Sequence, residues 1–172
     1  MISAVTLLRT DDQVGSRDRW SYVLLAEDLR RVTAEPKKNA HELFRRMVFN
    51  AAISNIDDHP RNHAVIAKDQ HWKLSPAYDL TPANPVSDER RDLAMSCGDY
   101  GRWANANNLL SQSARFLLSP TEATAIIDEV ETVVAVNWYR TLKAHGVSEP
   151  DAQTLKGAFL YPGFRLLPDR EA

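Results

Sequence analysis

Three oxygen-bearing side chains in the middle of the chain could together carry out one kind of chemistry. Asp57 and Asn62 lie in the stretch N-I-D-D-H-P-R-N, residues 55–62, and Asp79 follows seventeen residues after Asn62. A carboxylate can accept a proton from a hydroxyl group, and carboxylate and amide oxygens are the ligands that Mg²⁺ prefers. Phosphoryl transfer needs both functions, so the pattern predicts this reaction class.

Asp57 is the predicted general base. It stands five residues before Asn62, in the D-x-x-x-x-N spacing of protein-kinase catalytic loops, whereas the residue five after Asp58 is His63. The alternative is a loop aspartate that caps a turn. For an isolated aspartate the capping role would be the better interpretation, but the presence of Asn62 and Asp79 in the same pattern favours the catalytic role.

Asn62 and Asp79 are the predicted magnesium ligands, through the amide oxygen of the first and the carboxylate of the second. Their structural alternatives are a turn residue and a cap at the end of a strand. Arg61 could neutralise phosphate charge in a bound nucleotide, although a solvated surface arginine would explain it nearly as well.

The histidines of the same stretch invite a zinc interpretation, which the sequence opposes. His59 and His63 are four residues apart, as in the H-E-x-x-H motif, but Pro60 stands where that motif has glutamate. The motif must lie on a helix, and a proline at this position opposes one. We therefore expect His59 to brace the loop by hydrogen bonding.

Composition limits the classes of function. The chain has 172 residues, 44% of them hydrophobic, and a formal net charge of −2, which gives no overall attraction to nucleic acid. No stretch approaches the roughly 20 apolar residues of a membrane span, and the first residues lack a basic leader. Cys97 is the single cysteine, so no internal disulfide can form. We expect a cytoplasmic protein without membrane or direct nucleic-acid binding.

The elements that must position these residues can be predicted from local pattern. Apolar spacing predicts a helix over 22–32, followed by a break at residues 35–38 because of Pro36. A second helix is predicted to be capped by Asn39, with Glu42 as reciprocal partner, to place Asn50 on its polar face and to end near Ser54. Further expected elements are a hairpin of strands 64–67 and 71–74, a short strand over 93–96, a helix over 107–118, a helix that starts at Ser119-Pro120 and stops at Gly146, and an irregular tail over 161–172.

The residues already described resemble one family. The loop at 55–62, the stretch W-K-L-S-P-A-Y-D-L at 72–80 and the helix L-F-R-R-M-V-F-N at 43–50 are similar to the C-terminal lobe of HipA-type serine/threonine kinases, the toxins of bacterial toxin–antitoxin modules. The combination D-x-H-x-[KR]-N with P-x-Y-D is specific. The resemblance implies a mainly α kinase-like lobe, with a small β-hairpin after the catalytic loop, over residues 1–172.

The resemblance also implies an activity. Members transfer the γ-phosphate of ATP, with Mg²⁺, to a serine or threonine of a target protein, which leads to growth arrest and persistence. A small DNA-binding antitoxin, HipB-like, restrains the kinase. By motif match, Asp57 takes the place of the catalytic aspartate, His59 that of the loop histidine, and Asn62 and Asp79 those of the metal-binding residues.

The chain departs from the family pattern in what precedes the loop. Family members are much longer, and Gly15 is the only glycine before Asp57, so no glycine-rich phosphate loop is present there. We expect weak ATP binding and little activity from the chain alone, unless an N-terminal lobe is supplied in trans. The alternatives are a non-enzymatic helical domain that binds an antitoxin-like partner and, less favoured, a metal-dependent hydrolase.

Overall fold

The computed structural model describes residues 1–11, 13–83 and 87–167. The fold is mainly α with one small antiparallel sheet, as predicted. The strands are β1 (Ile2–Ser3), β2 (Ala64–Lys68) and β3 (His71–Leu74), and the α-helices are α1 (Ala4–Leu7), α2 (Tyr22–Val32), α3 (Pro36–Ala52), α4 (Ala106–Ser111), α5 (Pro120–Ala144) and α6 (Glu149–Leu155). Short 3-10 helices span Val14–Arg19, Pro60–Asn62, Ser113–Phe116, Lys156–Ala158 and Pro162–Arg165.

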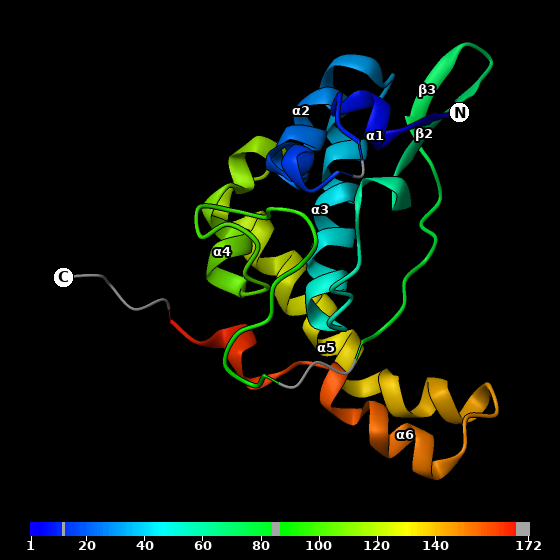
Figure 1. Ribbon diagram of the computed structural model, residues 1–172, viewed down its shortest axis with the longest axis vertical. Coiled ribbons are helices and arrows are strands. Elements are labelled where there is room, and N and C mark those ends of the chain that lie inside the picture. Colours follow the sequence, from blue (N-terminus) through cyan, green and yellow to red (C-terminus); the bar gives the residue numbers. More distant parts are fainter. Residues whose placement is uncertain (12, 84–86, 168–172) are drawn as a thin grey trace.

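Helix α3 runs through the middle of the molecule, between α2 and α5 (Figure 1). Its apolar rows are completely buried, with Leu43, Phe44 and Met47 at 0% exposure. Burying a side chain of this size contributes roughly 1.5–3 kcal/mol, so α3 contributes strongly to core stability. The loop that carries Asp57 begins where this helix ends, and so starts from a well-buried part of the fold.

Helix α3 begins earlier than predicted, because Pro36 starts it rather than breaking the chain. Glu35 is the N-cap, and a proline in the first turn loses no hydrogen bond since its missing N–H would have no partner there. Asn39 is therefore not the cap. Its Oδ1 instead accepts a hydrogen bond from the Leu74 N–H at 2.7 Å, which joins α3 to strand β3.

The predicted hairpin is confirmed and has a third strand. Val65 pairs with Leu74 across the hairpin, and Ile2 pairs with Val65 on the other side, giving the order β1-β2-β3. Asp69 and Gln70 turn the chain with left-handed φ angles of 52° and 64°. Strand β1 was not predicted, because two residues carry no alternation that could reveal a strand.

The expected helix over 107–118 is shorter than predicted. The Asn105 side chain caps α4 from one end, the helix stops at Ser111, and a 3-10 turn follows before Leu117 adopts a left-handed φ of 61°. The segment 93–96 forms no strand within the described residues; Ser96 makes a single parallel bridge with Ser21. Tertiary contacts override the local pattern at both places.

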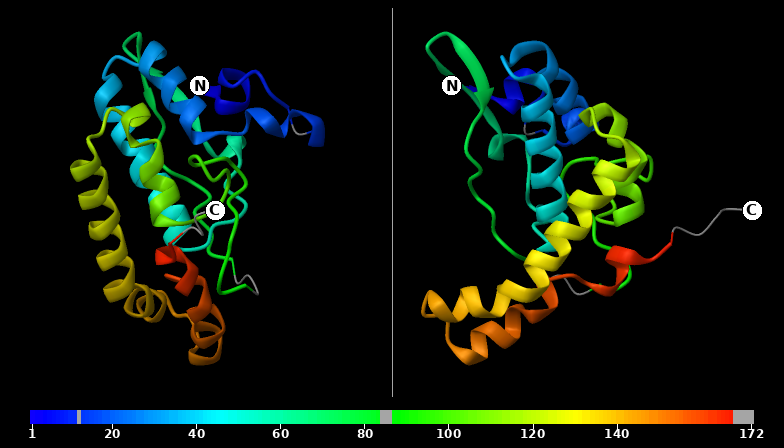
Figure 2. Two further views of the ribbon diagram at one scale, coloured as in Figure 1. Left: turned by 90° about the vertical axis from the view of Figure 1, so that its left-hand side faces the viewer. Right: turned by 180° about the vertical axis from the view of Figure 1, so that it is seen from behind.

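Helix α5 has the predicted capping box, in which the Ser119 N–H donates to Glu122 and the Glu122 N–H donates back to Ser119. The chain turns at Gly146, with a φ of 78°, and α6 returns along the end of α5 (Figure 2). No helix in the described parts of the chain is long and apolar enough to cross a membrane.

The beginning of the expected irregular tail is ordered by packing. Tyr161, which precedes the 3-10 helix Pro162–Arg165, is 2% exposed, and Phe164 within that helix is 1% exposed. The Asn105 amide donates to the Gly163 carbonyl at 2.8 Å. Two buried aromatic side chains hold this segment to the core, so the segment up to Arg165 is partly regular. The last five residues, 168–172, lie outside the described part of the chain.

Candidate functional site

The loop at 55–62 leaves α3 from a fixed point. Ser54 has a left-handed φ of 54°, and its hydroxyl donates to the Ala158 carbonyl at 2.7 Å. The buried Arg91 guanidinium donates to the same hydroxyl at 2.7 Å, and the Leu160 N–H donates to the Ala52 carbonyl at 2.8 Å. Segments about a hundred residues apart in sequence therefore meet at the root of the loop.

The inner side of the loop is held by Asp58, which is 1% exposed. Its Oδ2 accepts hydrogen bonds from the Tyr22 hydroxyl of α2 and from the Asn50 amide of α3, the latter at 2.8 Å. The Nε2 atom of His63, just past the loop, lies 2.8 Å from the same oxygen. Asp58 thus fastens the loop to two helices and to the start of β2.

The environment of this cluster is strongly desolvated. Burial, followed by the charge and hydrogen bond of Asp58, raises the pKa of the Tyr22 hydroxyl well above its ordinary value, so that the hydroxyl keeps its proton and donates. The Tyr22 and His63 rings meet edge to face at 5.6 Å. Within the described residues, Asp58 Oδ1 and His63 Nδ1 are buried without a hydrogen-bond partner. An unpaired buried polar group is costly, so the stability of the cluster should be sensitive to substitution of any of its members.

The outer side of the loop faces solvent and lines a cavity of about 390 Å³. Asp57, His59 and Arg61 all contribute to its wall, and the Asp57 side chain is exposed. The His59 Nε2 lies 3.3 Å from Arg61 Nη2, and the His59 ring meets Trp20 edge on at 6.2 Å. Three of the five predicted site residues therefore share one cavity.

Asp79 is joined to the loop through the backbone around it. The Tyr78 hydroxyl donates to the Arg61 carbonyl at 2.7 Å, and the Asn55 amide donates to the Asp79 carbonyl at 3.2 Å. Asp79 itself is exposed and has a left-handed φ of 57°. The segment after β3 thus lies against the loop, with a carboxylate directed outward from a constrained backbone.

Asn62 ends the 3-10 turn of the loop, where its N–H donates to the His59 carbonyl at 2.9 Å, and it is 6% exposed. Neither Asn62 nor Asp79 lines the cavity beside Asp57, as far as the described residues show. Among those residues, no group of three His, Cys, Asp or Glu side chains is arranged to hold a metal ion. The oxygen donors of Asn62 and Asp79 are nevertheless of the type that suits Mg²⁺.

The buried cluster was missed by reasoning from sequence, although one signal was available. Asn50 stands three residues after Met47 and seven after Leu43, which is the spacing of the buried row of α3. It was assigned to the polar face, but it is 0% exposed. A polar residue in an apolar row indicates a buried partner, and here that partner is Asp58.

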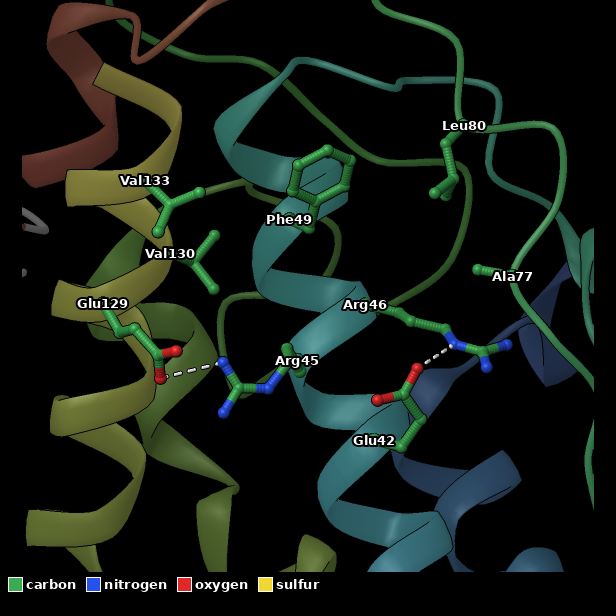
Figure 3. Close-up of a pocket in the computed structure, with 9 residues that line it drawn as sticks. All are labelled: Glu42, Arg45, Arg46, Phe49, Ala77, Leu80, Glu129, Val130 and Val133. Carbon is green, nitrogen blue, oxygen red and sulfur yellow. Dashed lines mark hydrogen bonds and ion pairs between the residues drawn. The ribbon is translucent and has the colours of Figure 1, made fainter. Parts of the chain in front are cut away.

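A second hollow, of about 330 Å³, lies between α3, α5 and the segment that carries Asp79 (Figure 3). Phe49, Val130 and Val133 form its apolar floor. The Arg45–Glu129 ion pair, at 2.9 Å, bridges the two helices at one side. None of the five predicted site residues lines this hollow.

Comparison with known proteins identifies relatives. A sequence model of the HipA-like C-terminal domain family matches residues 1–138. The chain is 35% identical over 72 residues to the "Putative kinase Y4mE" of Sinorhizobium fredii, a stretch that covers 42% of the chain and 17% of that protein.

The fold is similar to that of a solved structure, the toxin–antitoxin complex of HipA, HipB and operator DNA from Shewanella oneidensis MR-1. The TM-score is 0.67 and the sequence identity 13%, over 91% of this chain and 40% of the matching one. The chain therefore spans less than half the length of either relative, and the second likeness concerns the fold alone.

Proposed function

The chain belongs to the HipA-like C-terminal domain family, and on that premise we propose that it is the catalytic lobe of a serine/threonine protein kinase. The observation that carries the proposal is the outer side of the loop, where Asp57, His59 and Arg61 line one cavity. Hydrogen bonds from Tyr78 and Asn55 tie the Asp79 segment to the same loop.

In the proposed reaction the Asp57 carboxylate accepts a hydrogen bond from the acceptor hydroxyl and orients it. Asn62 and Asp79 would hold Mg²⁺ through oxygen atoms, and the ion, when bound, neutralises phosphate charge. His59 and Arg61 flank Asp57, and Arg61 adds positive charge beside the transferring group. The buried Asp58 cluster keeps the loop in one conformation while the outer side chains act.

The chain spans 40% of the solved relative, so we expect the part that covers the nucleotide to lie in an N-terminal lobe outside these 172 residues, in the same polypeptide or supplied in trans. Phosphate-covering elements supply positioning and charge stabilisation. The isolated chain should therefore bind Mg-ATP weakly and transfer phosphate slowly. By analogy with the solved complex of HipA with HipB and DNA, we further propose that a small DNA-binding antitoxin restrains this protein in the cytoplasm.

The test is incubation of the purified chain with Mg²⁺, γ-labelled ATP and a bacterial lysate, alone and with the N-terminal lobe of a HipA-type kinase. Labelled phosphoserine or phosphothreonine, identified by mass spectrometry and abolished by EDTA, is the expected result. No labelling in either mixture, together with capture of an antitoxin-like protein, would instead support a non-enzymatic interaction domain.

A further inference from the structure

We propose that one face of helix α5 is a dimer interface, through which two copies of this chain pack antiparallel about a two-fold axis. The face, called the α5 row below, consists of Glu129, Val133, Val136 and Arg140, which follow one another at intervals of four, three and four residues. Residues at these intervals lie along the same side of a helix. All four are exposed, so the row is open to a second molecule.

The centre of the α5 row is apolar. Val136 is 69% exposed and Val133 51% exposed, which makes them the most exposed large apolar side chains on the α-helices of the described residues. Val133 also forms part of the floor of the hollow of about 330 Å³ between α3 and α5, beside Phe49 and Val130 (Figure 3). The row and the hollow together make a contiguous apolar patch, and such a patch marks an interaction site.

The two ends of the α5 row carry opposite charges. At one end, Oε2 of Glu129 pairs with Arg45 of α3, and Oε1 has no hydrogen-bond or ion-pair partner in the described part of the chain. At the other end, the Arg140 guanidinium donates to the Asn137 side chain at 2.5 Å and pairs with no carboxylate among the described residues. One carboxylate oxygen and one cation are thus available to a neighbour.

This order of residues selects a second copy as the occupant. In a two-fold interface each contact occurs twice, once in each direction. With the axis midway between Val133 and Val136, antiparallel α5 helices bring Val133 of one copy against Val136 of the other, and Glu129 against Arg140 at both ends. A parallel pair would instead set Glu129 against Glu129 and Arg140 against Arg140. Charge complementarity therefore favours the antiparallel arrangement.

Each end of this interface holds three charges rather than two. The Arg45–Glu129 ion pair, at 2.9 Å, already bridges α3 and α5 (Figure 3), and Arg140 of the second copy adds a cation to the free oxygen of the same carboxylate. Charges in a network contribute more than an isolated exposed pair. None of these residues lines the cavity beside Asp57, so dimerisation leaves that cavity open and is independent of the proposed kinase reaction.

The first test is sedimentation equilibrium of the purified chain over a range of micromolar concentrations. One helix face is smaller than a standard interface, so we expect a dimer with a dissociation constant on the order of 10 μM. Val136→Asp places a carboxylate twice in the apolar centre and should weaken the dimer at least about tenfold. Leu167→Asp is the matched control, because Leu167 is an apolar residue that is 79% exposed and lies outside α5. It should leave the dissociation constant unchanged.

The second test reverses the charges at the ends of the row. Arg140→Glu sets two carboxylates against each other at both ends and should weaken the dimer about tenfold. The triple variant Arg45→Glu, Glu129→Arg, Arg140→Glu inverts the whole network and should restore the dimer to within about threefold of the wild type. Arg30→Glu, at an exposed arginine of α2, is the matched control and should have no effect.

Three outcomes would overturn the proposal. The first is a chain that stays monomeric at every concentration, which would leave this face to a different protein or to the rest of a longer polypeptide. The second is a dimer that Val136→Asp and Arg140→Glu leave intact, which would place the interface elsewhere. The third is a triple variant that dimerises no better than Arg140→Glu, which would exclude the antiparallel register. Circular dichroism of each variant confirms that it is folded, so a loss of dimer is read from folded protein.

Discussion

The inner and outer sides of the loop at 55–62 each carry an aspartate carboxylate, and the two carboxylates lie in opposite environments. Asp57 is exposed on a cavity and has its carboxylate available, whereas Asp58 is 1% exposed and accepts hydrogen bonds from Tyr22 and Asn50. The two aspartates are consecutive in sequence, yet Asp57 faces an open cavity and Asp58 is enclosed by its partners. Burial and partners, rather than residue type, determine which aspartate can act.

Of the substitutions that test this comparison, Asp58→Ala should have the largest effect on stability. The change leaves the Tyr22, Asn50 and His63 groups buried without their acceptor, and such losses destabilise by about 3–5 kcal/mol. Urea unfolding should show a marked drop in the midpoint. Asp58→Asn keeps one acceptor oxygen and should lose less stability than Asp58→Ala. A loss below about 1 kcal/mol for Asp58→Ala would show that the cluster is not the fastening of the loop.

Asp57→Asn should have the opposite effects: a large loss of phosphate transfer and little change in stability. Removing a general base costs about 10²–10⁴-fold in rate, while an exposed substitution changes stability by no more than about 0.5 kcal/mol. Phosphate transfer is measured with the N-terminal lobe present, under conditions in which the wild type is active, and urea unfolding is measured on the same preparation of the chain. Asp69→Asn is the matched control, since Asp69 is an exposed aspartate in the hairpin turn, at a left-handed position that asparagine tolerates. Equal activity of the two variants would exclude Asp57 as the base.

A milder change on the inner side is Tyr22→Phe, which removes one donor and keeps the ring against His63. A hydrogen bond to a charged group contributes about 1.5–3 kcal/mol, so this variant should be less stable than the wild type and more stable than Asp58→Ala. Urea unfolding again provides the measurement. A stability equal to that of the wild type would mean that the Asp58 carboxylate does not depend on this donor.

The smallest expected effect concerns pH. The pKa of Tyr22 is raised in the folded state, chiefly by burial, so its contribution to stability is full below the ordinary tyrosine pKa of about 10 and is lost as pH rises toward the folded pKa. The free energy of unfolding should therefore decline more steeply above pH 10 (roughly) for the wild type than for Tyr22→Phe. Parallel declines would show that Tyr22 ionises as easily as in the unfolded chain.

Local signals predicted much of the fold because each depends on residues close in sequence. The box of Ser119 and Glu122, the stop at Gly146 and the hairpin after the loop all belong to this class. Pro36 shows how such a signal can be misassigned, since proline begins a helix as readily as it prevents one.

Contacts between distant segments could not be predicted in this way. The pairing of β1 with β2 joins residues more than sixty positions apart, and the Asp58 cluster joins α2, α3 and the loop. Within the site, the motif identified the residues on the outer side but gave no sign that Asp58 and His63 support them from within. A sequence motif is more informative about side chains that contact a ligand than about side chains that hold the loop backbone in place.

The anchoring of Ser54 bears on where the polypeptide should be cut for expression or crystallisation. The family match ends at residue 138, yet the Ala158 carbonyl and the Leu160 N–H bind the root of the loop from beyond that limit. A shortened protein ending there would keep every motif residue and lose the contacts that fix their starting point. Boundaries drawn from similarity alone are therefore too tight. A safe cut lies after Leu167, because Arg165 pairs with Asp128 of α5 and the Leu166 carbonyl accepts a hydrogen bond from the Asn105 amide.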